Sequence, residues 1–92
     1  AGLSTVVELG PGSGEKLVTL LADHLEREVT VHLVDVSAAA LDKAARAVAA
    51  CCALPIVEHQ TTYEAGLAEV RPSVTAGKTL YKVRTDVAGL PR

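Results

Sequence analysis

The chain has 92 residues, a formal net charge of −2 and a hydrophobic content of 49%, with no Phe, Trp or Met. A chain of this length can form one small domain, and its balanced charge without a basic run excludes the electrostatic signature of a nucleic-acid-binding protein. Because no apolar stretch approaches the ~20 residues of a membrane span, we expect a cytoplasmic protein with neither a membrane nor a nucleic-acid partner.

The first predicted elements are a strand at residues 4–9 and a helix at residues 15–27, joined by a glycine-rich loop. Glycines at three alternate positions, Gly10, Gly12 and Gly14, allow positive φ angles and let a ligand approach the backbone closely. A buried strand that turns through such a loop into a helix is the start of a nucleotide-binding Rossmann-type fold. The loop is therefore the primary candidate for a binding site.

The residues around the loop distinguish two kinds of nucleotide. The dinucleotide fingerprint G-x-G-x-x-G requires a glycine at position 15, where this chain has Glu15. Pyrophosphate binds at a helix N-terminus because free N–H groups and the helix dipole attract anions, and Glu8 and Glu15 would oppose it. S-adenosylmethionine carries a sulfonium and an ammonium and no phosphate, so acidic flanks suit it. An NAD-binding oxidoreductase domain is the weaker alternative.

A second strand is predicted at residues 29–34, and Asp35 follows it directly. An acidic residue about 20 positions after the glycines, at the end of the second strand, is where a nucleotide ribose meets such a sheet. An ionised carboxylate can accept hydrogen bonds from both ribose hydroxyls. The alternative is that Asp35 only begins a turn or caps the next helix. Paired with the glycine loop, the ribose interpretation is favoured.

Ser37 is the predicted N-cap of a helix over residues 38–52. The apolar stripe of this helix comprises Leu41, Ala44, Ala45 and Val48. Cys51 and Cys52 are interpreted as small buried residues, because a disulfide between neighbours is strained. Together with His59 they lack the two-residue ligand spacing typical of zinc sites, so we predict no metal site.

The last predicted elements are a strand at residues 56–59, a helix at residues 63–70 and a strand at residues 78–83. Thr61 and Glu64 have the spacing of a capping box, and Lys82 suggests that the last strand lies at a sheet edge. We expect an α/β fold: a partial Rossmann-like open parallel sheet of about four strands in the order 3-2-1-4, with helices on both faces. Residues 1–83 are predicted to form this domain, and residues 84–92 a C-terminal tail.

Three stretches carry a resemblance to known enzymes. Residues 8–14, Glu-Leu-Gly-Pro-Gly-Ser-Gly, resemble motif I of the class I S-adenosylmethionine-dependent methyltransferases. Residues 8–16, 34–37 and 62–67 are similar to the histidine-specific methyltransferase family, which includes the enzymes that trimethylate the α-amine of histidine in ergothioneine synthesis. The resemblance implies S-adenosyl-L-methionine as the cofactor and a small-molecule methyl acceptor, an amino acid or amine such as histidine.

The resemblance also implies which residues bind the cofactor. Glu8 would face its methionine ammonium, Asp35 its ribose, and Thr62 stands where the family usually has an acid that binds the adenine amine. The full set of expected cofactor-binding residues is Glu8, Gly10, Pro11, Gly12, Ser13, Gly14, Asp35, Val36 and Thr62. Tyr63 is expected either to lie against the adenine ring or to pack in the core. No general base is identified.

The chain departs from the family after the last predicted strand, where residues 82–87 lack the family's glycine-, serine- and asparagine-containing loop. Because the chain begins with Ala1 and the predicted sheet is incomplete, we expect a fragment that a partner could complete, and a homodimer is one form of this. The alternative function is a truncated, non-catalytic Rossmann-like module. Affinity for S-adenosylhomocysteine, for NAD or for neither would separate the three functions.

Overall fold

The computed structural model describes residues 3–12, 14–22, 29–73 and 78–83. Its elements follow in the order β1 (Leu3–Leu9), α1 (Glu15–Ala22), β2 (Thr30–Asp35), α2 (Ala38–Cys51), β3 (Ile56–Gln60), α3 (Tyr63–Val70), the 3-10 helix η1 (Arg71–Ser73) and β4 (Lys78–Val83). Each predicted strand and helix is confirmed to within one residue where it is described. Ser13, residues 23–27 of the first predicted helix and the predicted tail at residues 84–92 lie outside the described residues.

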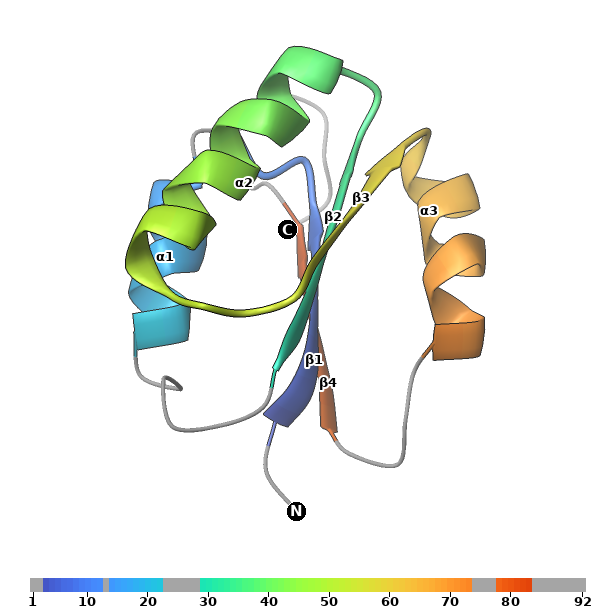
Figure 1. Ribbon diagram of the computed structural model, residues 1–92. Coiled ribbons are helices and arrows are strands. Elements are labelled where there is room, and N and C mark those ends of the chain that lie inside the picture. Colours follow the sequence, from blue (N-terminus) through green and yellow to red (C-terminus); the bar gives the residue numbers. More distant parts are fainter. Residues whose placement is uncertain (1–2, 13, 23–28, 74–77, 84–92) are drawn as a thin grey trace.

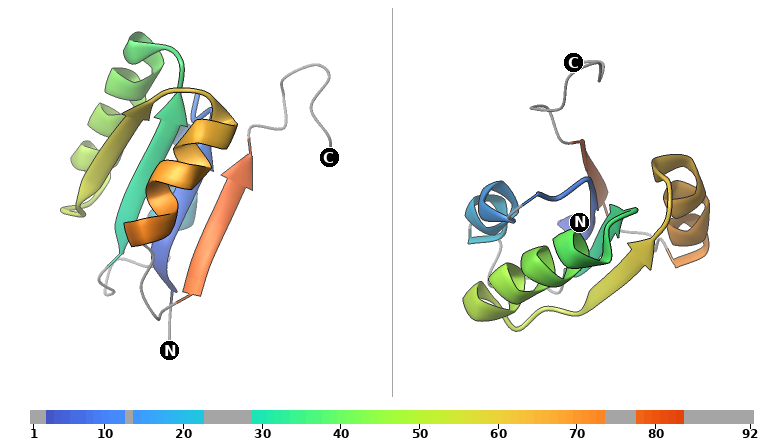
Figure 2. Two further views of the ribbon diagram at one scale, coloured as in Figure 1. Left: turned by 90° about the vertical axis from the view of Figure 1, so that its right-hand side faces the viewer. Right: turned by 90° about the horizontal axis from the view of Figure 1, so that it is seen from above.

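The four strands form one parallel sheet in the order β3-β2-β1-β4 (Figures 1 and 2). This is the predicted order, and it places β4 at one edge of the described sheet and β3 at the other. Parallel pairing requires each connection to cross from one end of the sheet to the other, and the helices make these crossings. The carboxyl ends of all four strands consequently lie at the same end of the sheet, which we call its carboxyl edge.

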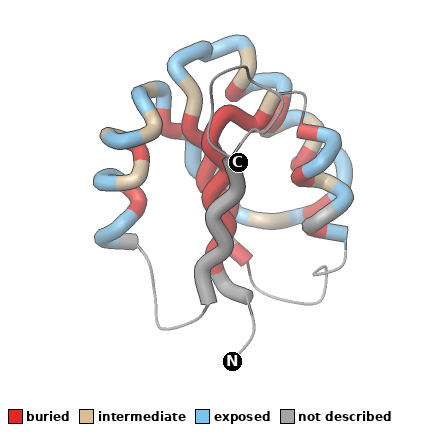
Figure 3. Tube along the Cα trace, turned by 180° about the vertical axis from the view of Figure 1, so that it is seen from behind, coloured by how far each residue is buried: buried red, intermediate tan, exposed pale blue. Residues whose placement is uncertain are grey.

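The helices cover both faces of the sheet, as predicted: α1 and α2 lie on one face and α3 on the other (Figure 1). Two apolar clusters fill the spaces between these layers, and β1 and β2 are deeply buried where their side chains are described (Figure 3). The larger cluster, under α1 and α2, includes Val6, Leu17, Leu33, Leu41 and Val48. The smaller cluster, under α3, contains Val7, Leu9, Val34 and Val70.

Helix α2 begins at its predicted cap, where the Ser37 hydroxyl accepts a 3.2 Å hydrogen bond from the Ala40 N–H. The predicted stripe faces the sheet, but the expectation that both cysteines are buried is wrong for Cys51, which is exposed, whereas Cys52 is buried. Cys51 is the last residue of α2, whereas Cys52 follows it in an extended conformation (φ −143°, ψ 146°), so the two side chains have different surroundings. Burial and the adjacent Cys51 thiol raise the pKa of the Cys52 thiol to about 11.

Among the described residues, the helices are too short or too polar to cross a bilayer.

Candidate functional site

The loop between β1 and α1 has the backbone that its glycines predict. Gly10, Gly12 and Gly14 have φ angles of 70°, 60° and 84°, a region that side chains other than glycine's rarely enter. The Gly14 N–H donates to the Pro11 carbonyl at 3.1 Å, and the Gly14 carbonyl accepts from the Val18 N–H at 2.9 Å. The loop therefore closes on itself before α1 begins.

Two of these glycines have different surroundings. A Cβ atom added at Gly14 would lie 3.1 Å from the Ala44 Cα and 3.2 Å from the Ala47 Cβ, so Gly14 lets the loop lie close against α2. A Cβ atom added at Gly12 would meet no described atom within 4 Å. The space beside Gly12 is the part of the loop that a ligand could approach.

Asp35 ends β2 beside this loop. The Gly10 N–H donates to the Val34 carbonyl at 2.8 Å, which joins the loop to the end of β2. The Asp35 carboxylate accepts a 2.9 Å hydrogen bond from the Ser37 N–H through Oδ1. The turn interpretation of Asp35 is therefore correct, and it is compatible with ligand binding because a carboxylate has about four acceptor positions.

Val36 and Thr62 lie on the segments that leave β2 and β3. Val36 is 65% exposed, an unusual exposure for an apolar side chain. Thr62 caps α3, because its hydroxyl accepts from the Ala65 N–H at 3.2 Å. The predicted capping box from Thr61 to Glu64 is therefore wrong by one residue. Tyr63, expected either against adenine or in the core, packs against the apolar cluster under α3.

Glu8 is an acidic residue of β1 that lies close to the glycine loop in the sequence. Its side chain is only 3% exposed, and its Cα pairs with that of Leu33, a residue of the core under α1 and α2. A buried carboxylate is costly unless other groups compensate its charge. Glu8 therefore places an acidic group inside the molecule, two residues before Gly10.

Three chain segments thus meet at the carboxyl edge of the sheet. Besides the bond from Gly10 to Val34, the Thr61 N–H donates to the Asp35 carbonyl at 3.0 Å. These two bonds bring the ends of β1, β2 and β3 together, with the glycine loop, Asp35 and Thr62 along one edge. Of the expected site residues, Ser13 lies outside the described part of the chain.

The sequence analysis did not predict a polar cluster that contains two buried histidines. The His32 Nδ1 lies 2.9 Å from the His59 Nε2, and the His59 Nδ1 lies 2.9 Å from the Glu69 Oε1. His32 and His59 come from different strands, and their contact depends on strand register, which the sequence pattern does not reveal. Among the described residues, no group of three metal-ligating side chains is arranged to hold a metal ion.

The comparisons with known proteins give one family. The comparison with curated proteins found no match, and neither did the comparison with solved structures. The family described as histidine-specific methyltransferase, SAM-dependent, matches residues 1–82. This range includes the glycine loop, Asp35, the first three strands and all of β4 except Val83. The chain therefore belongs to the family of histidine-specific, S-adenosylmethionine-dependent methyltransferases.

Proposed function

We propose that this chain binds S-adenosylmethionine at the carboxyl edge of its sheet and is the cofactor-binding domain, residues 1–83, of an enzyme that methylates a small amine such as histidine. One observation supports the site most directly. The hydrogen bonds from Gly10 to Val34 and from Thr61 to Asp35 join three strand ends at one edge. In open α/β sheets this edge is where ligands bind.

The residues at the edge fit the charges and shape of the cofactor. Glu8 and Asp35 are acidic, which suits a ligand with an ammonium, a sulfonium and two ribose hydroxyls. In our proposal Glu8 faces the ammonium, directly or through water, and Asp35 accepts from the ribose. The open space beside Gly12 admits the ligand next to the backbone, and the exposed Val36 offers an apolar surface to the adenine.

S-adenosylmethionine, when bound, supplies a methyl group made electrophilic by the sulfonium. The residues of this chain would contribute by binding and orientation, since holding two reactants in line can supply much of a rate enhancement. Asp35 is suited to this task because its Oδ1 is held by the Ser37 N–H at 2.9 Å, which fixes the carboxylate before a ligand arrives. The acceptor class, an amine of an amino acid such as histidine, rests on the family description.

A calorimetric titration of the chain with S-adenosylhomocysteine tests the proposal. We expect saturable binding that Asp35→Asn weakens about ten- to hundredfold, because hydrogen bonds to a charged group contribute about 1.5–3 kcal/mol. Asparagine retains an oxygen that can accept from the Ser37 N–H, so the turn is preserved. Asp42→Asn is the matched control, since Asp42 lies on the exposed side of α2 and pairs with Arg46.

Three outcomes separate the functions. Binding of S-adenosylhomocysteine that depends on Asp35 and not on Asp42 supports the cofactor site, and methylation of free histidine, measured by mass spectrometry, would then test the acceptor. Binding of NAD would favour the oxidoreductase alternative. A folded chain that binds neither ligand would refute the cofactor proposal and leave a non-catalytic module.

A further inference from the structure

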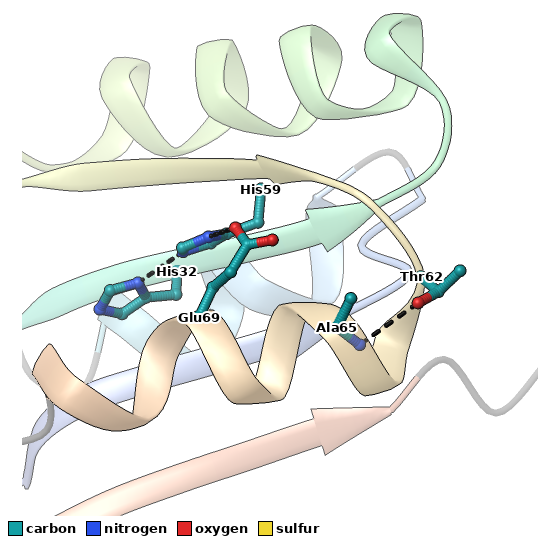
Figure 4. Close-up of polar contacts among 5 residues, drawn as sticks. All are labelled: His32, His59, Thr62, Ala65 and Glu69. Carbon is teal, nitrogen blue, oxygen red and sulfur yellow. Dashed lines mark hydrogen bonds and ion pairs between the residues drawn. The ribbon is translucent and has the colours of Figure 1, made fainter.

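His32, His59 and Glu69 form a hydrogen-bonded chain between the sheet and α3, which we name the histidine clasp (Figure 4). His32 comes from β2, His59 from β3, and Glu69 from the last turn of α3. The two imidazole rings are stacked, with centroids 5.2 Å apart. His32 is 2% exposed and His59 9%, whereas the Glu69 side chain is about half exposed. The clasp therefore runs from the buried sheet to the surface of α3.

Strand register explains how the two histidines meet. In the pairing of β2 with β3, His32 lies opposite Val57 and His59 lies opposite Val34. Residues two apart on a strand share a face, so both histidines project from the α3 face as diagonal neighbours. A one-residue shift of β3 would place His59 on the opposite face and abolish the contact.

The Glu69 carboxylate fixes the direction of the hydrogen bonds when both rings are neutral. An ionised carboxylate only accepts, so the His59 Nδ1 must carry the proton that faces it. The His59 Nε2 is then an acceptor, and the His32 Nδ1 must donate to it. Neutral histidines in this clasp should therefore both carry their proton on Nδ1, although isolated imidazole side chains favour Nε2.

The clasp can hold one additional proton without losing a hydrogen bond. With a proton on each of its nitrogens, His59 donates to Glu69 and to the His32 Nδ1, which becomes the acceptor because the proton of neutral His32 is now on Nε2. A second additional proton would place two N–H groups, and two positive charges, face to face across 2.9 Å. We propose that His32 and His59 form a buried binding site for a single proton, with Glu69 as its counter-ion, and that a second proton releases α3 from the sheet.

The surroundings of the two rings are consistent with a site that holds a single additional proton. Burial, and then the neighbouring His59, lower the pKa of His32 from 6.5. Val7 of β1 lies opposite His32 and is apolar. Each ring has the other as a titratable hydrogen-bond partner, and His59 also has Glu69; on the same side of the sheet, Tyr63 of α3 is half-buried and Arg71, in η1, is exposed.

Release of α3 would affect the residues at the carboxyl edge of the sheet. Besides the hydrogen bond of Glu69, α3 packs on the sheet through the apolar cluster of Val7, Leu9, Val34 and Val70. The other end of α3 begins at Thr62, next to the bond from Thr61 to Asp35. This step rests on the proposed function: if Asp35 and Thr62 bind the cofactor, uptake of the second proton by the clasp should weaken cofactor binding.

Nitrogen-15 spectra of the histidine side chains test the clasp in the complete chain without any ligand. At pH 8 we expect both His32 and His59 to carry their proton on Nδ1. Glu69→Gln should shift His59 toward the Nε2 form, because an amide can donate as well as accept. Glu64→Gln, an exposed position at the start of α3, should leave both rings unchanged. Nε2-protonated rings in the unmodified chain would refute the hydrogen-bond direction.

Amide hydrogen exchange tests the release. We expect the protection of α3 amides, corrected for intrinsic exchange, to fall below pH 6.5 by up to about tenfold per pH unit for one proton taken up, while α2 remains protected. His32→Asn keeps a side-chain N–H near the Nδ1 position but does not titrate, so it should remove this pH dependence. Equal pH dependence in the variant, or none in the unmodified chain, would refute the release of α3.

The affinity for S-adenosylhomocysteine, measured at pH 7.5 and 5.5, separates the clasp from the cofactor proposal. A chain that shows the predicted tautomers and exchange but binds no S-adenosylhomocysteine at either pH retains the clasp and loses the proposed function. Affinity that is equal at both pH values, in a chain whose α3 protection falls, would refute the coupling of α3 to the site.

Discussion

All three glycines of the β1–α1 loop have positive φ angles, but Gly12 and Gly14 differ in their surroundings and therefore in their roles. Gly14 touches α2 through Ala44 and Ala47, and Gly12 faces open space among the described residues. The sequence pattern gave both the same interpretation, close approach of a ligand. Only the packing of α2 distinguishes a glycine required by a neighbouring helix from one that leaves room for a ligand.

Alanine substitutions should separate these roles. Both Gly12→Ala and Gly14→Ala place a side chain in a left-handed conformation that costs about 1–2 kcal/mol. Gly14→Ala adds contacts at 3.1 and 3.2 Å with α2, and such overpacking costs about 1–3 kcal/mol more. We therefore expect urea unfolding to show a larger loss of stability for Gly14→Ala. Equal losses would mean that α2 is not the reason for Gly14.

Residue-level predictions succeeded where the local sequence determines the contact. Ser37 caps α2 because its hydroxyl accepts from a backbone N–H three residues away. The sequence did not reveal which cysteine is buried. It also did not link His32 to His59, because that contact joins residues 27 positions apart.

At the level of elements, the position of α3 depends on Gly66. A Cβ atom built at Gly66 would overlap the Val34 side chain of β2, with Cγ2 at 2.9 Å. Glycine is a poor helix former, so its presence in the middle of α3 indicates that the helix needs this close approach. The sequence predicted the bounds of α3 but gave no reason for a glycine inside it.

Gly66→Ala should consequently destabilise the protein. By helix propensity alone alanine would add about 0.5–1 kcal/mol of stability, but Val34 is branched at Cβ and cannot turn its methyl groups away freely. We expect a net loss of about 1–3 kcal/mol, typical of an overpacked core, measured by urea unfolding. Ala68→Gly, at an exposed position of α3, measures the propensity effect separately. A gain in stability for Gly66→Ala would show that α3 can shift without cost.

At the level of the whole molecule, the order β3-β2-β1-β4 was predictable because few topologies satisfy the rules for parallel strands. Alternating strands and helices require crossovers, and right-handed crossovers from β1 through β2 to β3, followed by a return to the other side of β1, give this order. The carboxyl edge, and with it the meeting of the glycine loop and Asp35, follows from the topology. The register between paired strands does not follow from the topology, and so the clasp between β2, β3 and α3 was not predictable.

The lowered pKa of His32 makes the stability of the whole fold depend on pH. Burial, with His59, lowers this pKa in the folded state from 6.5, whereas in the unfolded chain it returns to about 6.5. Between these values the unfolded chain binds more protons, so the free energy of unfolding must fall as the pH falls. The contribution is fully present above pH 6.5 and is lost as the pH falls toward the lowered value.

Urea unfolding at a series of pH values from 8 to 5 measures this loss. One proton gives a slope of at most about 1.4 kcal/mol per pH unit, and most carboxylates titrate at lower pH, near 4. His32→Asn should flatten the slope below pH 6.5, because asparagine does not titrate. Glu64→Gln, at an exposed position of α3, is the control and should leave the contribution of His32 unchanged. If His32→Asn retains the full slope, protonation of this buried ring is not what destabilises the fold in acid.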